Sequence, residues 1–207
     1  MNRYDSYKHS ELEWIGEIPS HWNLIRGKFI FQNKKEINKN NQELNLLSLT
    51  LNGVLNKDIK SNEGLRPTDY STYQVFEKDD LVFKLIDLEN KRTSRVGLVH
   101  ERGIMSPVYI RLEPNNNIDS KFSYYYYYNL YKQYIFNFLG SGVRSSLTPT
   151  NLLEIELPLP SISEQKQIVE FLDTKTKLID SLVEKTERKI ELLKEQRTSL
   201  INETVTK

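Results

Sequence analysis

The sequence predicts an α+β protein, in which a β-rich globular domain is followed by one long C-terminal coiled-coil helix. Between residues 44 and 112, short apolar runs rich in Val, Ile, Leu and Phe are separated by turn residues, which is typical of strands. The last quarter instead repeats apolar residues at alternating spacings of three and four, which is a heptad pattern. We therefore expect a globular domain over residues 1–160 and a long helix over residues 161–207.

The composition narrows the class of protein. The chain has 207 residues, no cysteine and a formal net charge of +1, so it forms no disulfide and lacks the strong basicity of proteins that coat nucleic acid. No segment approaches the roughly 20 apolar residues of a membrane span. We expect a soluble, cytoplasmic protein without a membrane role. Any binding of nucleic acid must then come from a local patch.

The N-terminal part is expected to contain an irregular segment followed by strands. Trp14 and Trp22 flank a glycine and a proline, and we expect both rings to seal an edge of the core. Residues 24–32 should begin a strand or a helix. Residues 44–51 read as a strand that ends in a tight turn at Asn52-Gly53.

Three more apolar runs continue the β-rich pattern. Residues 75–86 combine a turn with a buried strand, and residues 96–99 and 108–112 are further strands. Their connections are short, so the domain is expected to be β-rich with short turns.

Residues 119–139 change character and predict a helix. Asp119 or Ser120 can cap its first turn, and the glycines that follow residue 139 can end it. The helix contains five consecutive tyrosines at residues 124–128. Such rings could stack on bases, but we favour a helix with one buried face and phenol groups that reach water.

The predicted long helix follows the proline-rich segment at residues 157–160. The prolines end the preceding element, and Ser161 or Ser163 can cap the new helix. A helix from about Ser163 to Thr204 is roughly 60 Å long. Charges of alternating sign occupy its other faces and suit solvent. The strongest apolar positions of the seam, where we expect dimerisation, are Leu172, Ile179, Val183, Ile190, Leu193 and Leu200.

Motifs of catalysis are missing from the sequence. It contains no glycine-rich nucleotide loop, no Walker A loop and no nucleophile elbow. His9, His21 and His100 are scattered without metal-ligand spacing. We therefore expect a protein that is not an enzyme and needs neither a metal nor another cofactor.

The first candidate binding segment is residues 84–95, where a buried strand leads into a polar loop. Arginine suits guanine, asparagine suits adenine, and lysine and serine suit phosphates. The composition also fits an ordinary surface loop. The residues expected to contact DNA are Lys84, Asn90, Lys91, Arg92, Ser94 and Arg95.

The second candidate is residues 140–147, where two glycines permit close approach of the backbone. Arg144 and Ser145 could bind a phosphate or a base edge, although this segment also fits an ordinary loop. Together with Arg92 and Arg95, Arg144 is expected to make the contacts that carry sequence information.

Read together, four segments resemble the specificity subunit of Type I restriction-modification systems. They are residues 13–22 (EWIGEIPSHW), 91–97 (KRTSRVG), 141–144 (SGVR) and 155–168, which contains IELPLP and EQKQI. The resemblance covers the whole chain. Its most specific parts are the first and the last of these segments.

The resemblance implies a non-catalytic protein that binds double-stranded DNA. Such subunits contain two target-recognition domains, each of which reads part of a split site and is followed by a long spacer helix. The two helices pair antiparallel and set the distance between the half-sites. Methyltransferase subunits dock on this frame and modify adenines, and restriction subunits, when present, translocate and cut.

This sequence differs from that pattern because it holds one recognition domain and one spacer helix. A homodimer with antiparallel helices would supply the missing half, and it would read a palindromic split site. Two alternatives stay open. The chain could be a fragment of a two-domain specificity subunit, or an adaptor that binds proteins through the coiled-coil helix.

Overall fold

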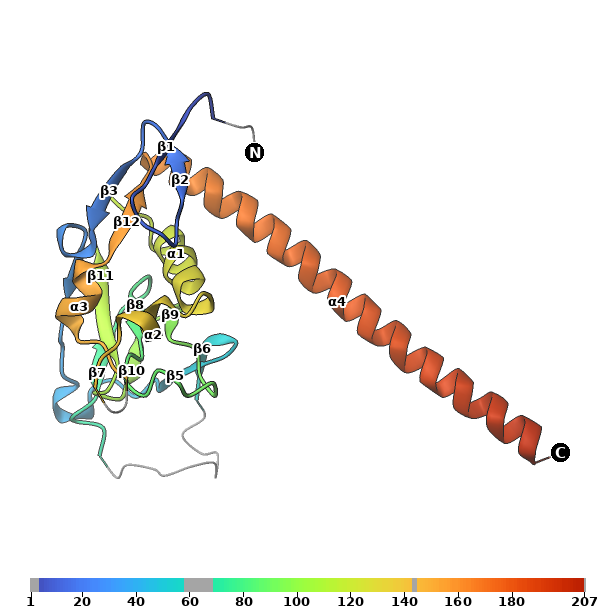
Figure 1. Cartoon of the computed structure of the whole chain (residues 1–207). Coiled ribbons are helices and arrows are strands. Elements are labelled where there is room, and N and C mark those ends of the chain that lie inside the picture. Colours follow the sequence, from blue (N-terminus) through green and yellow to red (C-terminus); the bar gives the residue numbers. More distant parts are fainter. Residues whose placement is uncertain (1–3, 58–68, 143–144, 207) are drawn as a thin grey trace. The chain divides into compact units, whose positions relative to one another are not determined.

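The computed structural model describes residues 4–57, 69–142 and 145–206 of the chain. Its residues group into two compact units, residues 2–166 and residues 167–207. The first unit is β-rich with short helices, and the second consists of the greater part of one long helix (Figure 1). The predicted α+β class is therefore confirmed.

All strands named here pair antiparallel, and the largest sheet has the order β4-β11-β8-β9. Four two-stranded sheets accompany it: β1-β2, β12-β3, β5-β6 and β10-β7. The strands are β1 (Tyr7–His9), β2 (Glu17–Pro19), β3 (Asn23–Arg26), β4 (Phe31–Asn33), β5 (Leu47–Thr50), β6 (Gly53–Asn56), β7 (Gln74–Phe76), β8 (Leu81–Phe83), β9 (Val96–Leu98), β10 (Gly103–Met105), β11 (Ile110–Pro114) and β12 (Glu156–Leu159).

Helices connect and cover these sheets. They are η1 (Gly27–Phe29), η2 (Lys39–Asn41), α1 (Ser120–Lys132), α2 (Ile135–Leu139), α3 (Pro149–Glu154) and α4 (Ile162–Val205). α1 contacts β9. One core cluster lies where strands of three sheets meet, and its buried residues are Leu47, Leu49, Val54, Phe76, Val82, Val99 and Met105.

The strand expected over residues 44–51 is β5, which is shorter than expected and pairs with β6 from Leu47–Asn56 to Thr50–Gly53, so the tight turn lies one residue before the expected Asn52-Gly53. Its turn consists of Leu51 and Asn52, and Gly53 follows with φ +95°. Glycine suits that left-handed conformation because it has no Cβ to clash.

Two strand pairs depart from the sequence prediction. The N-terminal segment that was expected to be irregular forms the β1-β2 hairpin. The prolines that were expected to end an element instead belong to or flank β12, with Pro158 paired opposite Leu24 of β3. A two-stranded sheet has only edge strands, and an edge tolerates a residue without a backbone N–H.

The helix predicted over residues 119–139 is interrupted. Asp119 caps α1 by accepting hydrogen bonds from the backbone N–H groups of Lys121 and Phe122. α1 ends at Lys132, and α2 begins after Tyr134, whose φ of 60° is left-handed. That conformation breaks a right-handed helix and is uncommon for a bulky residue.

The tyrosine run divides between core and surface. As predicted, α1 has a buried face, but Tyr127 is completely buried, with its ring 5.1 Å from that of Phe83 between centroids. Its hydroxyl group therefore does not reach water. Tyr126 donates to the carbonyl of Glu156 at 2.6 Å and accepts from the Trp14 indole at 3.2 Å.

A charged pair lies inside the domain. The Arg111 side chain is completely buried, and its Nε lies 2.6 Å from Oδ2 of Asp80. Arg111 also donates from Nη1 to the carbonyl of Val75 at 2.8 Å. Because each charge would be costly to bury alone, these groups fix β8 and β11 beside β7.

Glu164, in the first turn of α4, forms hydrogen bonds with side chains near the N-terminus of the first unit. Its carboxylate lies 2.7 Å from His21 Nε2 and accepts from the Trp22 indole at 3.2 Å. Glu164 and Ser161 also form a reciprocal cap, since Ser161 N donates to Glu164 Oε2 at 3.0 Å and Glu164 N donates to Ser161 Oγ at 3.3 Å.

Gln165 completes this anchor from a fully buried position. Its amide group donates to the carbonyls of Pro160 at 2.9 Å and Asn117 at 3.3 Å, and its Oε1 accepts from Asp119 N at 2.7 Å. The proline-rich segment and the first turn of α4 are thus hydrogen-bonded through Gln165 to the loop that precedes α1.

α4 contains 44 residues and is about 66 Å long at the usual rise per residue. Apart from Leu172, which is partly exposed, the predicted seam residues are 46–57 % exposed. No helix among the described residues is apolar and long enough to cross a membrane.

The Glu164 anchor predicts an acid-dependent loss of stability. Partial burial alone would raise the pKa of Glu164, but hydrogen bonds from His21, Ser161 and Trp22 outweigh it and lower this pKa to about 2. Because the pKa of Glu164 is lower in the folded than in the unfolded protein, its ionised carboxylate stabilises the fold at pH values above about 4.5. This stabilisation is lost as the pH falls from about 4.5 towards 2. Urea unfolding at pH 7 and pH 3 should show a loss of roughly 1–2 kcal/mol from this group.

Glu164→Gln should be less stable than the wild type at pH 7 and should lose less on acidification. Glu187→Gln, at an exposed position of the same helix, is the control and should follow the wild type. Equal acid sensitivity of the wild type and Glu164→Gln would contradict this role for Glu164.

Candidate nucleic-acid interface

The structure brings together the two loops that the sequence singled out. Leu88 N donates to the carbonyl of Ser145 at 3.1 Å, and Leu147 N donates to the carbonyl of Leu85 at 2.9 Å. Gly140 permits this approach, since a Cβ there would lie 2.6 Å from Ser145 Oγ and 2.9 Å from Leu88 Cδ1. Residues 84–95 and the described part of the second loop, residues 140–142 and 145–147, therefore lie side by side.

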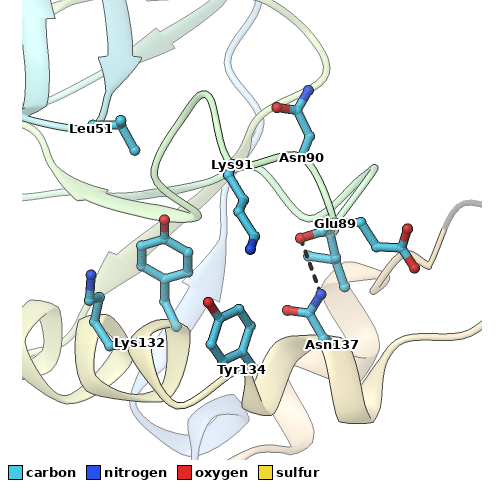
Figure 2. Close-up of a pocket in the computed structure, with 9 residues that line it drawn as sticks. Leu51, Glu89, Asn90, Lys91, Lys132, Tyr134 and Asn137 are labelled. Atoms are coloured by element: carbon cyan, nitrogen blue, oxygen red, sulfur yellow. Dashed lines mark hydrogen bonds between the residues drawn. The ribbon is translucent and has the colours of Figure 1, made fainter.

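α2 also contacts the first of these two loops. Asn137 Nδ2 donates to the carbonyl of Leu88 at 3.2 Å (Figure 2). The ring centroid of Phe136, which is completely buried, lies 6.3 Å from that of Phe83 in β8. The loop that follows β8 is therefore tied to both the helix and the second loop.

The candidate residues differ in exposure. Lys91 and Arg92 are exposed, whereas Lys84, Asn90 and Ser145 are partly buried. Arg144 lies outside the described residues. Lys91 and Arg92 are thus the cations of the first loop that are most open to a large ligand.

Arg95 has an interior position. Its side chain is 1 % exposed, and its guanidinium donates to the carbonyls of Asp87, at 2.8 Å, and of Asn90. Burial lowers the pKa of Arg95, against the opposing influence of Tyr131 and Asp87. This side chain holds the loop from within, because it satisfies carbonyl groups of a turn that strands cannot pair.

Ser94 is also buried, and its Oγ donates to the carbonyl of Val96 at 2.7 Å. The sequence predicts that Ser94 and Arg95 contact DNA, but neither side chain faces solvent in this conformation. The geometry assigns both side chains a supporting role, because each donates to a backbone carbonyl group. The sequence offered no signal of this role.

The tip of the loop is ordered by its own side chains. Asn90 Nδ2 donates to Asp87 Oδ2 at 3.3 Å, while its Oδ1 accepts from Arg92 N at 2.9 Å. Asp87 has a left-handed φ of 53°, which asparagine and aspartate tolerate better than most residues. The backbone of Arg92 is thereby fixed, and its side chain extends from a defined position.

Sequence reasoning missed the contribution of the α1-α2 junction. A pocket of about 390 Å³ lies beside the loop, and Tyr131, Lys132 and Tyr134 line it together with Lys91. These residues lie some 40 positions from Lys91, and the helix break at Tyr134 has no glycine or proline to mark it. Only folding brings them beside the loop.

No cluster of metal-ligating side chains occurs among the residues that the structure describes. The surface offers ammonium, guanidinium, amide and phenol groups. These groups suit hydrogen bonding to phosphates and base edges.

Comparison with known families gives a match to the Type I restriction modification DNA specificity domain over residues 15–192. The match covers most of the chain, and the protein therefore belongs to this family. The resemblance predicted from the sequence is confirmed. No curated protein matches the sequence significantly.

Solved structures share the fold. A chain from a structural study of complex assembly and conformational transition in a type I R-M system has 18 % identity and a TM-score of 0.57, with 85 % of this chain and 42 % of that chain covered. The HsdS subunit from Thermoanaerobacter tengcongensis has 18 % identity and a TM-score of 0.53, with 85 % and 41 % covered. The present chain thus aligns with less than half of each.

The interior position of Arg95 yields a test. Arg95→Met should lower the free energy of unfolding by about 1–3 kcal/mol, because it leaves buried carbonyls unpaired. Hydrogen exchange should accelerate selectively in residues 86–92. The matched variant Arg92→Met, at an exposed position, should change the free energy of unfolding by less than about 0.5 kcal/mol. Equal effects of the two variants would remove Arg95 from its supporting role.

Proposed function

We propose that the protein is the sequence-specific DNA-recognition and scaffolding subunit of a Type I restriction-modification complex that methylates adenine. It acts in the cytoplasm as a homodimer and reads a palindromic split site. The observation that supports this proposal is the pair of hydrogen bonds that joins residues 85 and 88 to residues 145 and 147, in a domain of the specificity family.

In this proposal the exposed side chains contact DNA and the buried ones hold the loops. Lys84, Asn90, Lys91, Arg92, Arg144 and Ser145 line the DNA face, with Arg92 and Arg144 reading bases. Ser94 and Arg95 keep the backbone of the first loop in place. A preorganised loop loses less conformational entropy on binding.

The homodimer is supported by the exposed seam of α4. Ile179, Val183, Ile190, Leu193 and Leu200 are each about half exposed, and such a heptad row is normally buried against another helix. A second copy of the chain presents the same row. Antiparallel pairing of two copies would place two identical domains in inverted orientation, as a palindromic site requires.

A second apolar row supports docking of methyltransferase subunits. Phe171, Leu178, Leu182 and Leu192 are 38–57 % exposed. Leu182 is at heptad position g, which flanks the seam, and the other three are at position c, on the far side of g from the seam. One partner helix covers only a narrow a/d stripe, so a wider stripe suits a bundle with additional helices.

Catalysis resides in the methyltransferase subunits. Incubation of this subunit alone with S-adenosylmethionine and DNA should transfer no methyl group. Restriction subunits join where the system has them.

DNA binding should be strongly salt-dependent, because contacts to phosphates release counterions.

Fluorescence anisotropy of labelled duplex DNA should show that Arg92→Gln relaxes the preference at one base position, at a cost of about 1–3 kcal/mol in binding free energy. Glu187→Gln, an exposed change on α4, is the control. A preference that is unchanged in Arg92→Gln would exclude Arg92 as a base-reading residue.

The mass in solution tests the homodimer. Light scattering should give twice the chain mass of 24.4 kDa, and the double variant Ile190→Glu and Leu193→Glu should be a monomer with intact domain structure. Arg188→Glu introduces the same change in net charge on another face of the helix and should remain a dimer. A wild-type monomer would instead indicate half of a two-domain specificity subunit.

The alternative role, an adaptor that binds proteins through α4, makes a different prediction. The near-neutral net charge of the chain is compatible with an adaptor role. Association through an apolar helix face depends weakly on salt, whereas DNA binding weakens steeply. Duplex binding that is absent at low salt, with and without methyltransferase subunits, would favour the adaptor.

A further inference from the structure

The pocket beside the first loop is built from three separate parts of the domain. Leu51 comes from the tip of the β5-β6 hairpin, Lys91 from the loop after β8, and Lys132 and Tyr134 from the α1-α2 junction. Its volume of about 390 Å³ falls in the range of pockets that hold small organic groups. Lys91, one of the proposed DNA contacts, lines it.

The walls combine exposed apolar groups with positive charge. Tyr134 is 59 % exposed and Leu51 is 55 % exposed, although both are residues that usually seek burial. In Figure 2 the Lys91 ammonium points into the pocket above the Tyr134 ring, while the Glu89 carboxylate is turned away from it.

The two ammonium groups are available to a ligand. Among the described residues, none of the ion pairs includes Lys91 or Lys132. Lys132 Nζ instead lies 5.9 Å from the centre of the Tyr131 ring. A pocket with two cations, one carboxylate and phenol rings is complementary to an anion that carries a flat or apolar body.

Tyr134 is held in place by its backbone. Its left-handed φ of 60° costs free energy for a bulky side chain, and such conformations persist only where the surroundings impose them. Here the helices on both sides impose it, since Tyr134 N donates to the carbonyl of Tyr131, and Asn137 and Phe138 both donate to the carbonyl of Tyr134. The backbone from which the Tyr134 ring extends is therefore well defined.

We propose that this pocket binds one nucleotide of the DNA strand next to the recognition loop. Lys91 and Lys132 pair with its phosphate, while Tyr134 and Leu51 contact its base or sugar. The proposal rests on the DNA-recognition function and adds Leu51, Lys132 and Tyr134 to it. These residues strengthen binding without reading a particular base, because phosphates and ring faces are common to all nucleotides.

Two substitutions separate the two kinds of contact. Lys132→Gln should weaken binding of random-sequence duplex DNA about equally across sequences and should reduce the salt slope by about 1. Tyr134→Asn keeps a residue that tolerates the left-handed backbone and removes the ring. It should weaken binding by roughly 5- to 100-fold, with an unchanged salt slope.

Matched controls exist on the same domain. Lys8→Gln removes an equivalent charge from β1, at an exposed position that does not line the pocket. Phe138→Asn removes an aromatic ring that is 81 % exposed on α2 and also does not line it. Both controls should bind DNA like the wild type, and all variants should have wild-type circular dichroism.

DNA binding by the wild type and by these variants shows separately whether the pocket takes a nucleotide and whether the protein recognises DNA. If wild type binds duplex DNA and Arg92→Gln weakens its preference, but Lys132→Gln and Tyr134→Asn bind like the controls, the pocket takes no nucleotide. If wild type binds no duplex DNA at low salt, even with its methyltransferase subunits, the recognition function itself is overturned.

Discussion

The hydrogen bonds of Glu164 and Gln165 are the constraint on which the rest of the structure depends. They join the first turn of α4 to His21 and Trp22 near the N-terminus and to the loop that leads into α1. A buried amide such as that of Gln165 is tolerable only when its donors and acceptor are paired. The start of α4 is therefore connected to both ends of the domain's sequence in the folded state. The two sequence segments that identify the family most specifically are the segments that this network connects.

A second division of roles governs the recognition surface. Charged residues that sit close together in the sequence point in opposite directions, with Arg95 turned inward to the loop carbonyls and Arg92 left in solvent. An inward arginine costs desolvation but fixes a turn that no strand could pair. The exposed side chains then start from defined backbone positions. In the proposed function, such a preorganised loop would need little further ordering to bind a duplex.

α4 follows a different principle from the domain. The domain buries a core of apolar residues, whereas α4, which is about 66 Å long, leaves its apolar rows about half exposed. Such a helix is stabilised by partners more than by its own contacts. In the proposed function, DNA recognition and assembly would therefore use separate parts of the chain, and a change in the seam of α4 would alter assembly without altering the proposed DNA-binding loops.

The sequence by itself determined the features that depend on local patterns. The heptad repeat predicts the long helix, the Asn52-Gly53 pair predicts the hairpin, and Asp119 predicts the start of α1, because periodicity, turn preference and capping act over a few residues. The tertiary structure alone decided the rest. It placed Pro158 in an edge strand, broke the helix at Tyr134, turned Arg95 inward and set Lys132 and Tyr134 beside Lys91. These outcomes follow from pairing and burial between distant segments, which a local pattern does not contain.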